Sequence, residues 1–302
     1  MTLPFKPMLS ASLDGVDLST LRYPLLASPK LDGVRCLIWE GVAYSRNAKP
    51  IRNHFVQAWA KDFHNLDGEL IVGSPVHDHT GEPLGRTQSG VMSFDGEPDF
   101  TFHLFDSPER ICPEFEASLA VTAKGVRGPR IQLVPHARVT GATGITLYEE
   151  DCLTAGYEGV MLRDPDGPYK HGRSTLREGY LMKLKRFTDG EAVVIGLEEG
   201  MVNHNELQRD ELGRAKRSKD SSGLVPSGMV GTIIARDPVW GELRIAPGTM
   251  THGDRRQIWE RYTLGAPTEV QLIGKTIHWR SFGYGVKDKP RFPRFYGIRE
   301  DV

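Results

Sequence analysis

Hydrophobic and polar residues follow different patterns in two parts of the chain. Up to residue 188, short apolar runs alternate with longer segments whose apolar residues recur at helical spacing. This alternation predicts strands at 34–39, 69–73, 101–105, 131–134, 159–163 and 180–185, and helices at 53–64, 109–124 and 145–155. Thr188-Asp189-Gly190 then has the composition of a hinge.

Short β-rich runs dominate after the hinge, and their spacing is typical of a small barrel or sandwich. The predicted elements are strands at 191–198, 229–236, 242–246, 268–273 and 276–282, with one helix near Asp254–Tyr262. We therefore predict an α+β protein with two domains, 1–188 and 189–302. The polar stretch 203–228 is expected to be a mobile loop, either simply solvated or a basic flap that closes on phosphates.

Composition gives broad limits on the protein class. The 302 residues, 39% hydrophobic and 25% charged, suit one large or two medium globular domains. No apolar run approaches the 18 residues of a membrane span, and the first seven residues lack a signal-peptide pattern. Cys36, Cys112 and Cys152 form neither a disulfide framework nor a zinc motif. We expect a cytoplasmic protein, or one in the host cytoplasm if its source is viral, without membrane contact.

Charge is distributed unevenly along the chain. Residues 1–167 hold 15 lysines and arginines against 22 acidic residues, whereas residues 168–302 hold 23 against 17. The overall net charge of −1 therefore hides a basic second half. A modest basic excess of this kind favours contact with a polyanion such as nucleic acid.

The most informative segment is Ser28-Pro29-Lys30-Leu31-Asp32-Gly33-Val34-Arg35. Gly33 permits a tight turn, which can bring the amine of Lys30 near Arg35, so that a phosphate would lie between two cations. A free lysine has a pKa of about 10.4, so only about 1 in 2,500 amines is neutral at pH 7. Neighbouring cations favour the neutral amine, and a bound metal can balance charge on phosphorus. A nucleophilic Lys30 therefore predicts further cations and a metal-binding carboxylate elsewhere in the chain.

Six further segments supply such residues in order. They are Ser45–Ile51, Leu66–Leu70, Phe102–Asp106, Tyr157–Arg163, Leu181–Lys185 and Arg291–Asp301. Each has a structural alternative, such as hairpin charges, a core aromatic or an exposed strand edge. Together with Lys30, however, they resemble the motifs of ATP-dependent DNA ligases, which are covalent nucleotidyltransferases. The resemblance runs from Lys30 to the last residue and favours the minimal two-domain form found in bacteriophages and viruses.

The resemblance implies a fold, a reaction and a set of ligands. The fold would be an adenylyltransferase domain of antiparallel sheets with flanking helices, followed by an OB-fold β-barrel. The reaction would seal nicks with a 3′-OH and a 5′-phosphate in double-stranded DNA, through a lysyl-AMP and then a DNA-adenylate. ATP and Mg²⁺ would be required, with Mn²⁺ as an alternative metal. The protein would act on nicked DNA as a monomer.

The resemblance also implies roles in nucleotide chemistry. Lys30 would attack the α-phosphate, Phe105 would stack on adenine, and Glu69 would bind the ribose. Glu158, together with Glu69, would hold the metal. The remaining contacts to AMP, the α-phosphate and the pyrophosphate would come from Ser28, Arg35, Lys183, Lys185, Arg299 and Asp301. Lys183 and Lys185 share one face of their strand because they alternate along it.

DNA contacts would come from two places. The segment after the first hairpin would supply Arg46, at the nick phosphate, and Lys49. The polar loop would supply Arg214, Lys216 and Arg217. Two departures from the family pattern are visible. Ser28 stands where relatives often carry an acid. No lysine follows Asp301, so that assistance to the leaving pyrophosphate would be weaker or would come from another cation, such as Lys287 or Lys289.

Three alternatives share parts of this pattern. An mRNA-capping guanylyltransferase shares the Lys30 motif and an attached barrel, but the ending Arg291–Asp301 favours a DNA ligase. An RNA ligase fits less well because many lack such a barrel. A catalytically inactive nick-binding module has no reason to retain Lys30, Glu158 and Lys183 together.

Overall fold

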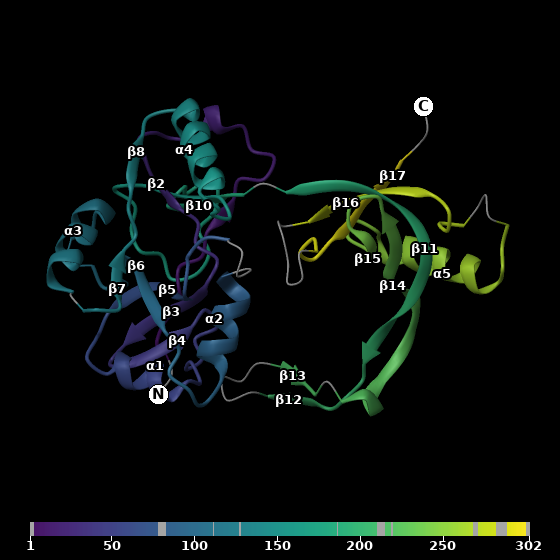
Figure 1. The fold of residues 1–302 in the computed structure, drawn as a ribbon, viewed down its shortest axis with the longest axis horizontal. Helices are drawn as coiled ribbons and strands as arrows, with labels where there is room; N and C mark the ends of the chain where they lie inside the picture. Colours follow the sequence, from purple (N-terminus) through teal and green to yellow (C-terminus); the bar gives the residue numbers. More distant parts are fainter. Residues whose placement is uncertain are drawn as a thin grey trace. The chain divides into compact units, whose positions relative to one another are not determined.

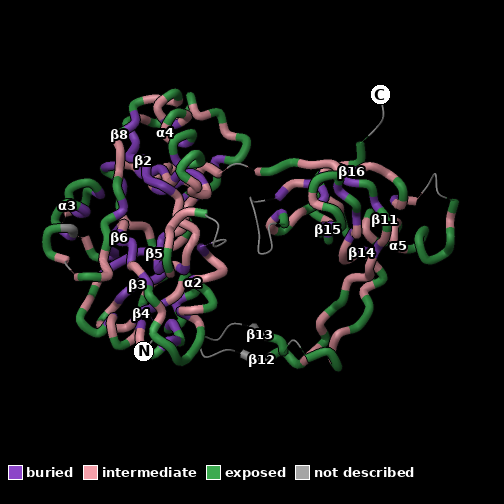
Figure 2. The backbone as a smooth tube through the Cα atoms, viewed as in Figure 1, coloured by how far each residue is buried: buried purple, intermediate pink, exposed green. Residues whose placement is uncertain are grey.

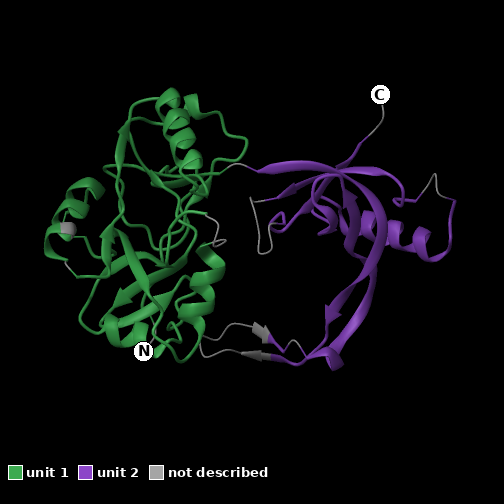
Figure 3. Ribbon diagram, viewed as in Figure 1, with its two compact units in different colours: residues 1–186 green, residues 187–302 purple. Residues whose placement is uncertain are grey.

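The computed structural model describes residues 3–77, 83–110, 112–126, 128–185, 187–209, 215–218, 220–267, 271–281 and 289–299. The chain divides into two compact units, residues 1–186 and 187–302 (Figure 3). This division lies beside the boundary that we predicted between residues 188 and 189. The expected hinge residues Thr188–Gly190 are not a loop, because they begin strand β11 and pair with Trp279–Ser281.

Unit 1 contains two five-stranded sheets (Figure 1). The first has the order β1-β10-β9-β2-β8, with strands Ala11–Ser12, Leu181–Leu184, Val160–Arg163, Leu25–Pro29 and Ala137–Val139. The second has the order β4-β3-β5-β6-β7, with strands Val42–Ser45, Val34–Trp39, Leu66–Val72, Phe100–Asp106 and Ile131–Leu133. Neighbouring strands are antiparallel except in the pairs β1–β10 and β6–β7. The predicted α+β class is confirmed.

Helices cover both sheets of unit 1. The short 3₁₀ helix η1 spans Leu18–Thr20, and the α-helices are α1 (His54–Ala60), α2 (Pro83–Met92), α3 (Phe115–Gly125) and α4 (Ala142–Thr154). The α1 helix begins where the side chain of Asn53 accepts a hydrogen bond from the backbone N–H of Val56 at 2.9 Å, an N-cap of the usual kind. The helix expected from residue 109 begins only after Pro113.

Helix α2 was not predicted, and its composition explains why. Two glycines, Gly85 and Gly90, lower the helix propensity of a ten-residue segment. Gly90 is needed because a Cβ there would lie 3.1 Å from the Cβ of Pro98 and 3.3 Å from Val72. Close packing on strand β5 therefore outweighs the local preference.

The interior of each unit is apolar, and Figure 2 shows the buried positions concentrated along the strands. In unit 1, one cluster lies between the second sheet and helices α1 and α2, and another lies between the first sheet and α4. Trp59 of α1 packs against Phe100 and Phe102 of β6, with ring centroids 5.0 and 5.5 Å apart. These two cores hold in place the sheets that carry the motifs described above.

Unit 2 is built on one five-stranded sheet of order β15-β14-β11-β16-β17. Its strands are Gly241–Ile245, Leu224–Asp237, Thr188–Asn203, Thr276–Ser281 and Arg294–Ile298, and helix α5 spans His252–Thr263. All these strand pairs are antiparallel. A single parallel bridge between Ala246 and Arg294 brings the two outer strands together. A five-stranded sheet whose edges meet in this way is a partly open barrel.

Two predictions for unit 2 need correction. Of the strand predicted at 268–273, residues 268–270 lie outside the described residues, and residues 271–273 form a bend and a turn that leads into Gly274, at φ +80°. The described part of 203–228 is not a simple loop either. Strands β11 and β14 continue as a two-stranded ribbon, and β12 (Leu207–Arg209) pairs with β13 (Ala215–Arg217) beyond it.

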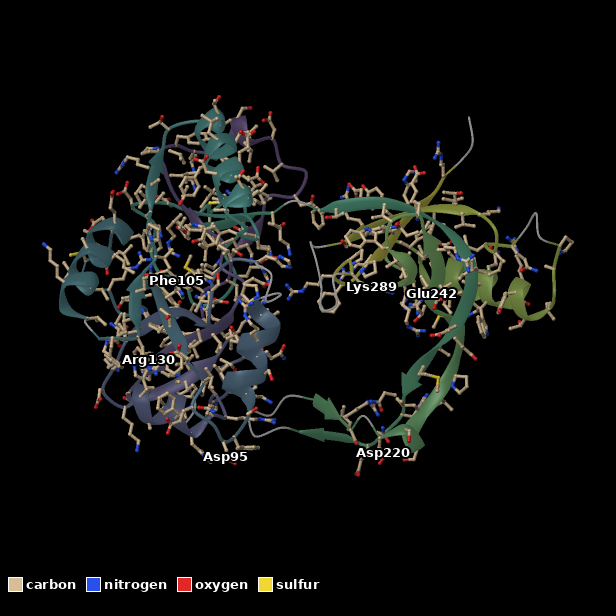
Figure 4. The ribbon with its side chains drawn as sticks, in the orientation of Figure 1. Asp95, Phe105, Arg130, Asp220, Glu242 and Lys289 are labelled. Carbon is tan, nitrogen blue, oxygen red and sulfur yellow. The ribbon has the colours of Figure 1, made fainter. Side chains whose placement is uncertain are left out.

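The turns of this ribbon are organised by asparagine side chains. The amide of Asn205 donates to the carbonyls of Ser218 and Asp220, each at 2.9 Å, and Asn203 donates to Ser218 at 2.7 Å. The 3₁₀ helix η2 (Ser221–Gly223) follows, near the labelled Asp220 in Figure 4. The polar composition that suggested a loop therefore serves hydrogen bonds within a hairpin.

Candidate functional site

A cavity of about 200 Å³ lies in unit 1, lined by residues of both its sheets. Strands β2, β9 and β10 supply one side, and β3, β5 and β6 supply another. Seven of the predicted site residues line it: Ser28, Lys30, Arg35, Arg46, Glu69, Phe105 and Lys183. Figure 4 shows Phe105 among the packed side chains of this unit. Residues spread over more than 150 positions of sequence thus meet in one concave site.

Lys30 follows the last residue of β2 and forms an ion pair with Glu158. Lys185 contacts the other oxygen of Glu158, with its Nζ 3.1 Å from Oε1. Burial alone would raise the pKa of Glu158, but the ammonium groups of Lys30 and Lys185 lower it below the usual value. The carboxylate is therefore ionised and shared between Lys30, which lines the cavity, and Lys185, which does not.

Gly159 makes this arrangement possible. Its φ of +150° is unfavourable for other residues, and a Cβ there would lie 2.3 Å from the carbonyl oxygen of Leu184. The carbonyl of Gly159 also accepts a hydrogen bond from the backbone N–H of Lys30 at 2.8 Å. Gly159 thus keeps Lys30 next to Glu158.

Lys183 adds positive charge to the same cavity. Burial is the main reason that its pKa is lowered, and the charges of Lys185, Lys30, Arg173 and Arg46 lower it further. A cluster of partly desolvated cations without an equal number of carboxylates is a suitable environment for a phosphate.

The buried carboxylate of Asp67 holds Arg35 in position. Its Nε lies 2.6 Å from Oδ1 of Asp67, and Nη2 contacts the other carboxylate oxygen, so the pair is bidentate. The side chain of Asp67 is fully buried, and it also accepts a hydrogen bond from the Tyr169 hydroxyl at 2.8 Å. The guanidinium lies 4.5 Å from the ring centroid of Phe105. Asp67 therefore fixes Arg35, and Arg35 in turn supports the aromatic ring.

Glu69 lies opposite Arg35 in the pairing of β3 with β5. Gly33 allows this close approach, because a Cβ at Gly33 would lie 2.9 Å from Cγ of Glu69 and 2.3 Å from the carbonyl of Leu70. Burial raises the pKa of Glu69 to about 7, although Arg35 and Lys30 oppose the shift. A carboxyl with this pKa can both donate and accept hydrogen bonds near neutral pH.

The raised pKa of Glu69 predicts a stability change with pH. Between its ordinary pKa of 4.5 and about 7, the folded protein retains a proton that the unfolded chain has lost. Stability relative to Glu69→Gln should therefore fall as pH rises through this window, by about 1–3 kcal/mol. Urea unfolding of both proteins at pH 5 and pH 8 measures the difference. A difference in unfolding free energy between the two proteins that stays constant with pH would contradict the raised pKa. Glu97→Gln, at an exposed glutamate, is the control.

Several residues of the site were not singled out from the sequence. Arg163 and Arg110 both pair with Asp106, at 2.6 and 3.1 Å, and flank the ring of Phe115. Arg163 and His136 line the cavity, as does Arg173. The strand alternation that places Met161 and Arg163 on one face could have identified Arg163. His136 and Arg173 lie outside the motifs and carried no such signal.

Other predicted residues lie elsewhere or outside the described residues. Lys49 is exposed and does not line the cavity. In unit 2, Arg299 pairs with Glu191 at 2.5 Å, Arg217 bonds the carbonyl of Asn205, and Lys289 bonds that of Glu242 at 2.8 Å. Arg214, Lys287, Asp301 and the side chain of Lys216 lie outside the described residues.

Metal binding was predicted at Glu158 and Glu69. Within the described ranges, no three His, Cys, Asp or Glu side chains are grouped as a complete metal site. Mg²⁺ often uses only one or two carboxylates and completes its shell with substrate phosphates and water. The ionised Glu158 beside a cationic cavity fits that kind of site. As for membranes, the described part of the chain contains no helix long and apolar enough to cross one.

Comparisons with known proteins bear on the whole chain. No family model matches it. The DNA ligase of monkeypox virus is 24% identical over 356 aligned residues, which cover 99% of this chain and 59% of the viral protein. The chain thus spans about three-fifths of the length of the first curated relatives.

Solved structures extend the similarity to the fold. A Lig E DNA ligase, described as binding DNA with a minimal scaffold, superposes with a TM-score of 0.69 at 22% identity and covers 98% of this chain and 100% of its own. Chlorella virus DNA ligase-adenylate gives a TM-score of 0.53 at 26% identity, covering 97% and 99%. These neighbours join a nucleotidyltransferase domain to an OB-fold, which confirms the predicted architecture. In sequence and in fold, the chain is therefore similar to ATP-dependent DNA ligases over nearly its whole length, as its motifs predicted.

Proposed function

We propose that this protein is an ATP-dependent DNA ligase that seals nicks between a 3′-OH and a 5′-phosphate in double-stranded DNA. The observation that carries the proposal is the shared contact of Lys30, Glu158 and Lys185 at the edge of a cationic cavity. A nucleophilic lysine, a carboxylate and a second lysine are the groups that a lysine-linked nucleotide requires.

In the first step, Nζ of Lys30 attacks the α-phosphorus of ATP. A nitrogen–phosphorus bond forms, the bond to the bridging oxygen breaks, and pyrophosphate leaves as the amine loses its protons. Lys183, Lys185 and Arg46 offset charge on the phosphate oxygens, since phosphoryl transfer depends mainly on positioning and cationic stabilisation. Nζ of Lys30 forms an ion pair with Glu158, so attack on the α-phosphorus requires that Nζ leave this carboxylate.

Nucleotide binding follows from the other residues of the cavity. Arg35 lies over one face of Phe105, so adenine would stack on the opposite face. Glu69 would bind the ribose hydroxyls, and Ser28 would contact the base. Glu158 would hold Mg²⁺ or Mn²⁺, which supplies charge neutralisation to the phosphates when bound.

The later steps involve the DNA. AMP moves from Lys30 to the 5′-phosphate at the nick, which forms a pyrophosphate linkage. The 3′-OH then attacks that phosphate, a phosphodiester bond forms, and AMP leaves. Arg46 and Lys49 would contact DNA next to the nick, and Arg214, Lys216 and Arg217 of unit 2 would contact the duplex. Arg299 and Asp301 would orient pyrophosphate in the first step. We expect the protein to act as a monomer.

Labelling distinguishes this proposal from its alternatives. The protein is incubated with Mg²⁺ and α-labelled ATP or GTP, separated on a denaturing gel, and then mixed with nicked DNA. We expect label from ATP to stay on the protein and to leave as the nick is sealed. Label from GTP would instead indicate a capping-type guanylyltransferase. Duplex binding without label from either nucleotide would indicate an inactive nick-binding module.

A further inference from the structure

Four side chains lie in one row across the first sheet of unit 1. Lys183 of β10 pairs with Met161 of β9, and Met161 pairs with Ser28 of β2. On its other side, β2 pairs with β8 through Ala27 and Ala137, and one further step of that register places His136 beside Ser28. Residues directly opposite in neighbouring strands share a face. All four side chains line the cavity, as this arrangement requires.

The row has a cationic end and an uncharged end. Lys183 lies at one end, near the cations Lys30, Arg46 and Arg173, and Met161 and Ser28 lead away from it toward His136. Strands are spaced by about 4.8 Å, so the row from Lys183 to His136 extends over roughly 14 Å. A nucleotide bound with its phosphate near Lys183 would therefore place its base near Ser28 and His136.

The ring of His136 has a defined hydrogen-bond polarity. Its Nδ1 lies 2.9 Å from the carbonyl oxygen of Val134, and because a carbonyl only accepts, Nδ1 must carry the proton. Burial is the largest cause of a lowered pKa at His136; Arg163 also lowers it, while the bond to Val134, Asp106 and Glu116 oppose the shift. The neutral ring therefore carries a lone pair on Nε2.

Nothing in the described protein uses that lone pair. No described residue makes a hydrogen bond to Nε2. Nε2 is also not one of the fully buried polar atoms without a partner, so it is not sealed inside the protein. The nearby cation Arg163 is paired with Asp106, and the ring of Phe115 meets the imidazole at a steep angle, 5.3 Å between centroids. The geometry leaves Nε2 as a hydrogen-bond acceptor open to a ligand in the cavity.

We propose that His136 is a specificity-determining residue that selects adenine by accepting a hydrogen bond from its 6-amino group. Adenine presents a donor at this position, whereas guanine presents the acceptor O6, which Nε2 would repel. Ser28 can donate or accept and so does not discriminate by itself. The proposal rests on the function proposed above and assigns base selection to a residue outside the recognised motifs.

The test compares three labelled nucleotides: ATP, GTP and purine riboside triphosphate, which lacks the 6-amino group. With the wild-type protein, we expect lysine labelling by ATP to exceed labelling by purine riboside triphosphate by roughly 10- to 100-fold in rate per concentration. In His136→Leu, this ratio should fall toward one, because the acceptor is gone. His136→Gln, whose amide can turn either oxygen or nitrogen to the base, should label with both ATP and GTP.

Matched controls separate specificity from damage to the fold. His103→Leu makes the same change at a buried histidine that does not line the cavity, and it should leave the ATP to purine riboside ratio unchanged. Equal losses with all three nucleotides in His136→Leu would show a structural role and overturn the inference. If the wild-type protein is labelled by ATP but His136→Leu keeps the wild-type ratio of ATP to purine riboside labelling, this inference alone is refuted. Absence of wild-type label from every nucleotide would refute the proposed function and the inference with it.

Discussion

Lys30→Ala is expected to abolish attachment of AMP to the protein while leaving the joining of a pre-adenylated nick intact. In the proposed reaction the amine of Lys30 is the nucleophile of the first step only, so its loss should lower AMP attachment by a factor on the order of 10⁴ to 10⁶. Only the last step, the attack of the 3′-OH, starts from an adenylate that is already on the DNA. Sealing should therefore fail on an ordinary nick with ATP and proceed when the 5′-adenylate is supplied.

Removal of Lys30 also affects a neighbouring residue of the site. Lys30 is the ion-pair partner of Glu158, so its removal changes the charge balance around a carboxylate proposed to hold metal. Lys124→Ala, at an exposed lysine of α3, is the matched control and should behave as wild type in both assays. If Lys30→Ala also fails on the pre-adenylated nick while retaining normal stability, Lys30 contributes to more than the first step.

Asp67→Asn is expected to lower the free energy of unfolding by about 3–5 kcal/mol. The carboxylate is fully buried and neutralises Arg35, whose side chain is only 16% exposed. The asparagine keeps the shape of the side chain but removes its charge, and its amide nitrogen would face the donors of Arg35. Urea unfolding of the two proteins measures the loss.

A graded series tests this explanation. Tyr169→Phe removes one hydrogen bond to Asp67 and should cost about 1 kcal/mol. Asp99→Asn, at a carboxylate whose side chain is 97% exposed beside Arg130, should have little effect because exposed ion pairs contribute little. If Asp67→Asn costs no more than Tyr169→Phe, the Arg35 charge must reach solvent when its partner is lost.

Local sequence signals predicted much of unit 1. The strand over 34–39 is strand β3 as observed, since its apolar residues and the turn at Gly33 agree with its position in the sheet. The lysine, glutamate and second lysine motifs also meet as their order suggested, because β2, β9 and β10 are adjacent in the first sheet. Their assigned roles remain predictions.

Sequence signals failed where distant packing decides the local structure. The acid in Asp67-Gly68-Glu69 looks like one hairpin charge among others, yet Asp67 is buried by partners at positions 35 and 169. His136 gains its significance from the register of β8 against β2, which no local pattern encodes. The sequence predicts a loop where β12 and β13 pair because the segment is polar, and the amides of Asn203 and Asn205 that bond the carbonyl of Ser218 next to β13 follow no local strand pattern.

The parallel bridge between Ala246 and Arg294 has a consequence for biosynthesis. Strand β17 leaves the ribosome after the other described strands of unit 2, and it covers the edge of β16 and meets the end of β15. Until Arg294 has been made, two strand edges stay unpaired, and exposed edges promote aggregation. Translation interrupted before Arg294 would therefore yield chains with all of unit 1 and an unprotected sheet in unit 2. The cell would meet such chains as substrates for chaperones and proteases rather than as partly active enzyme.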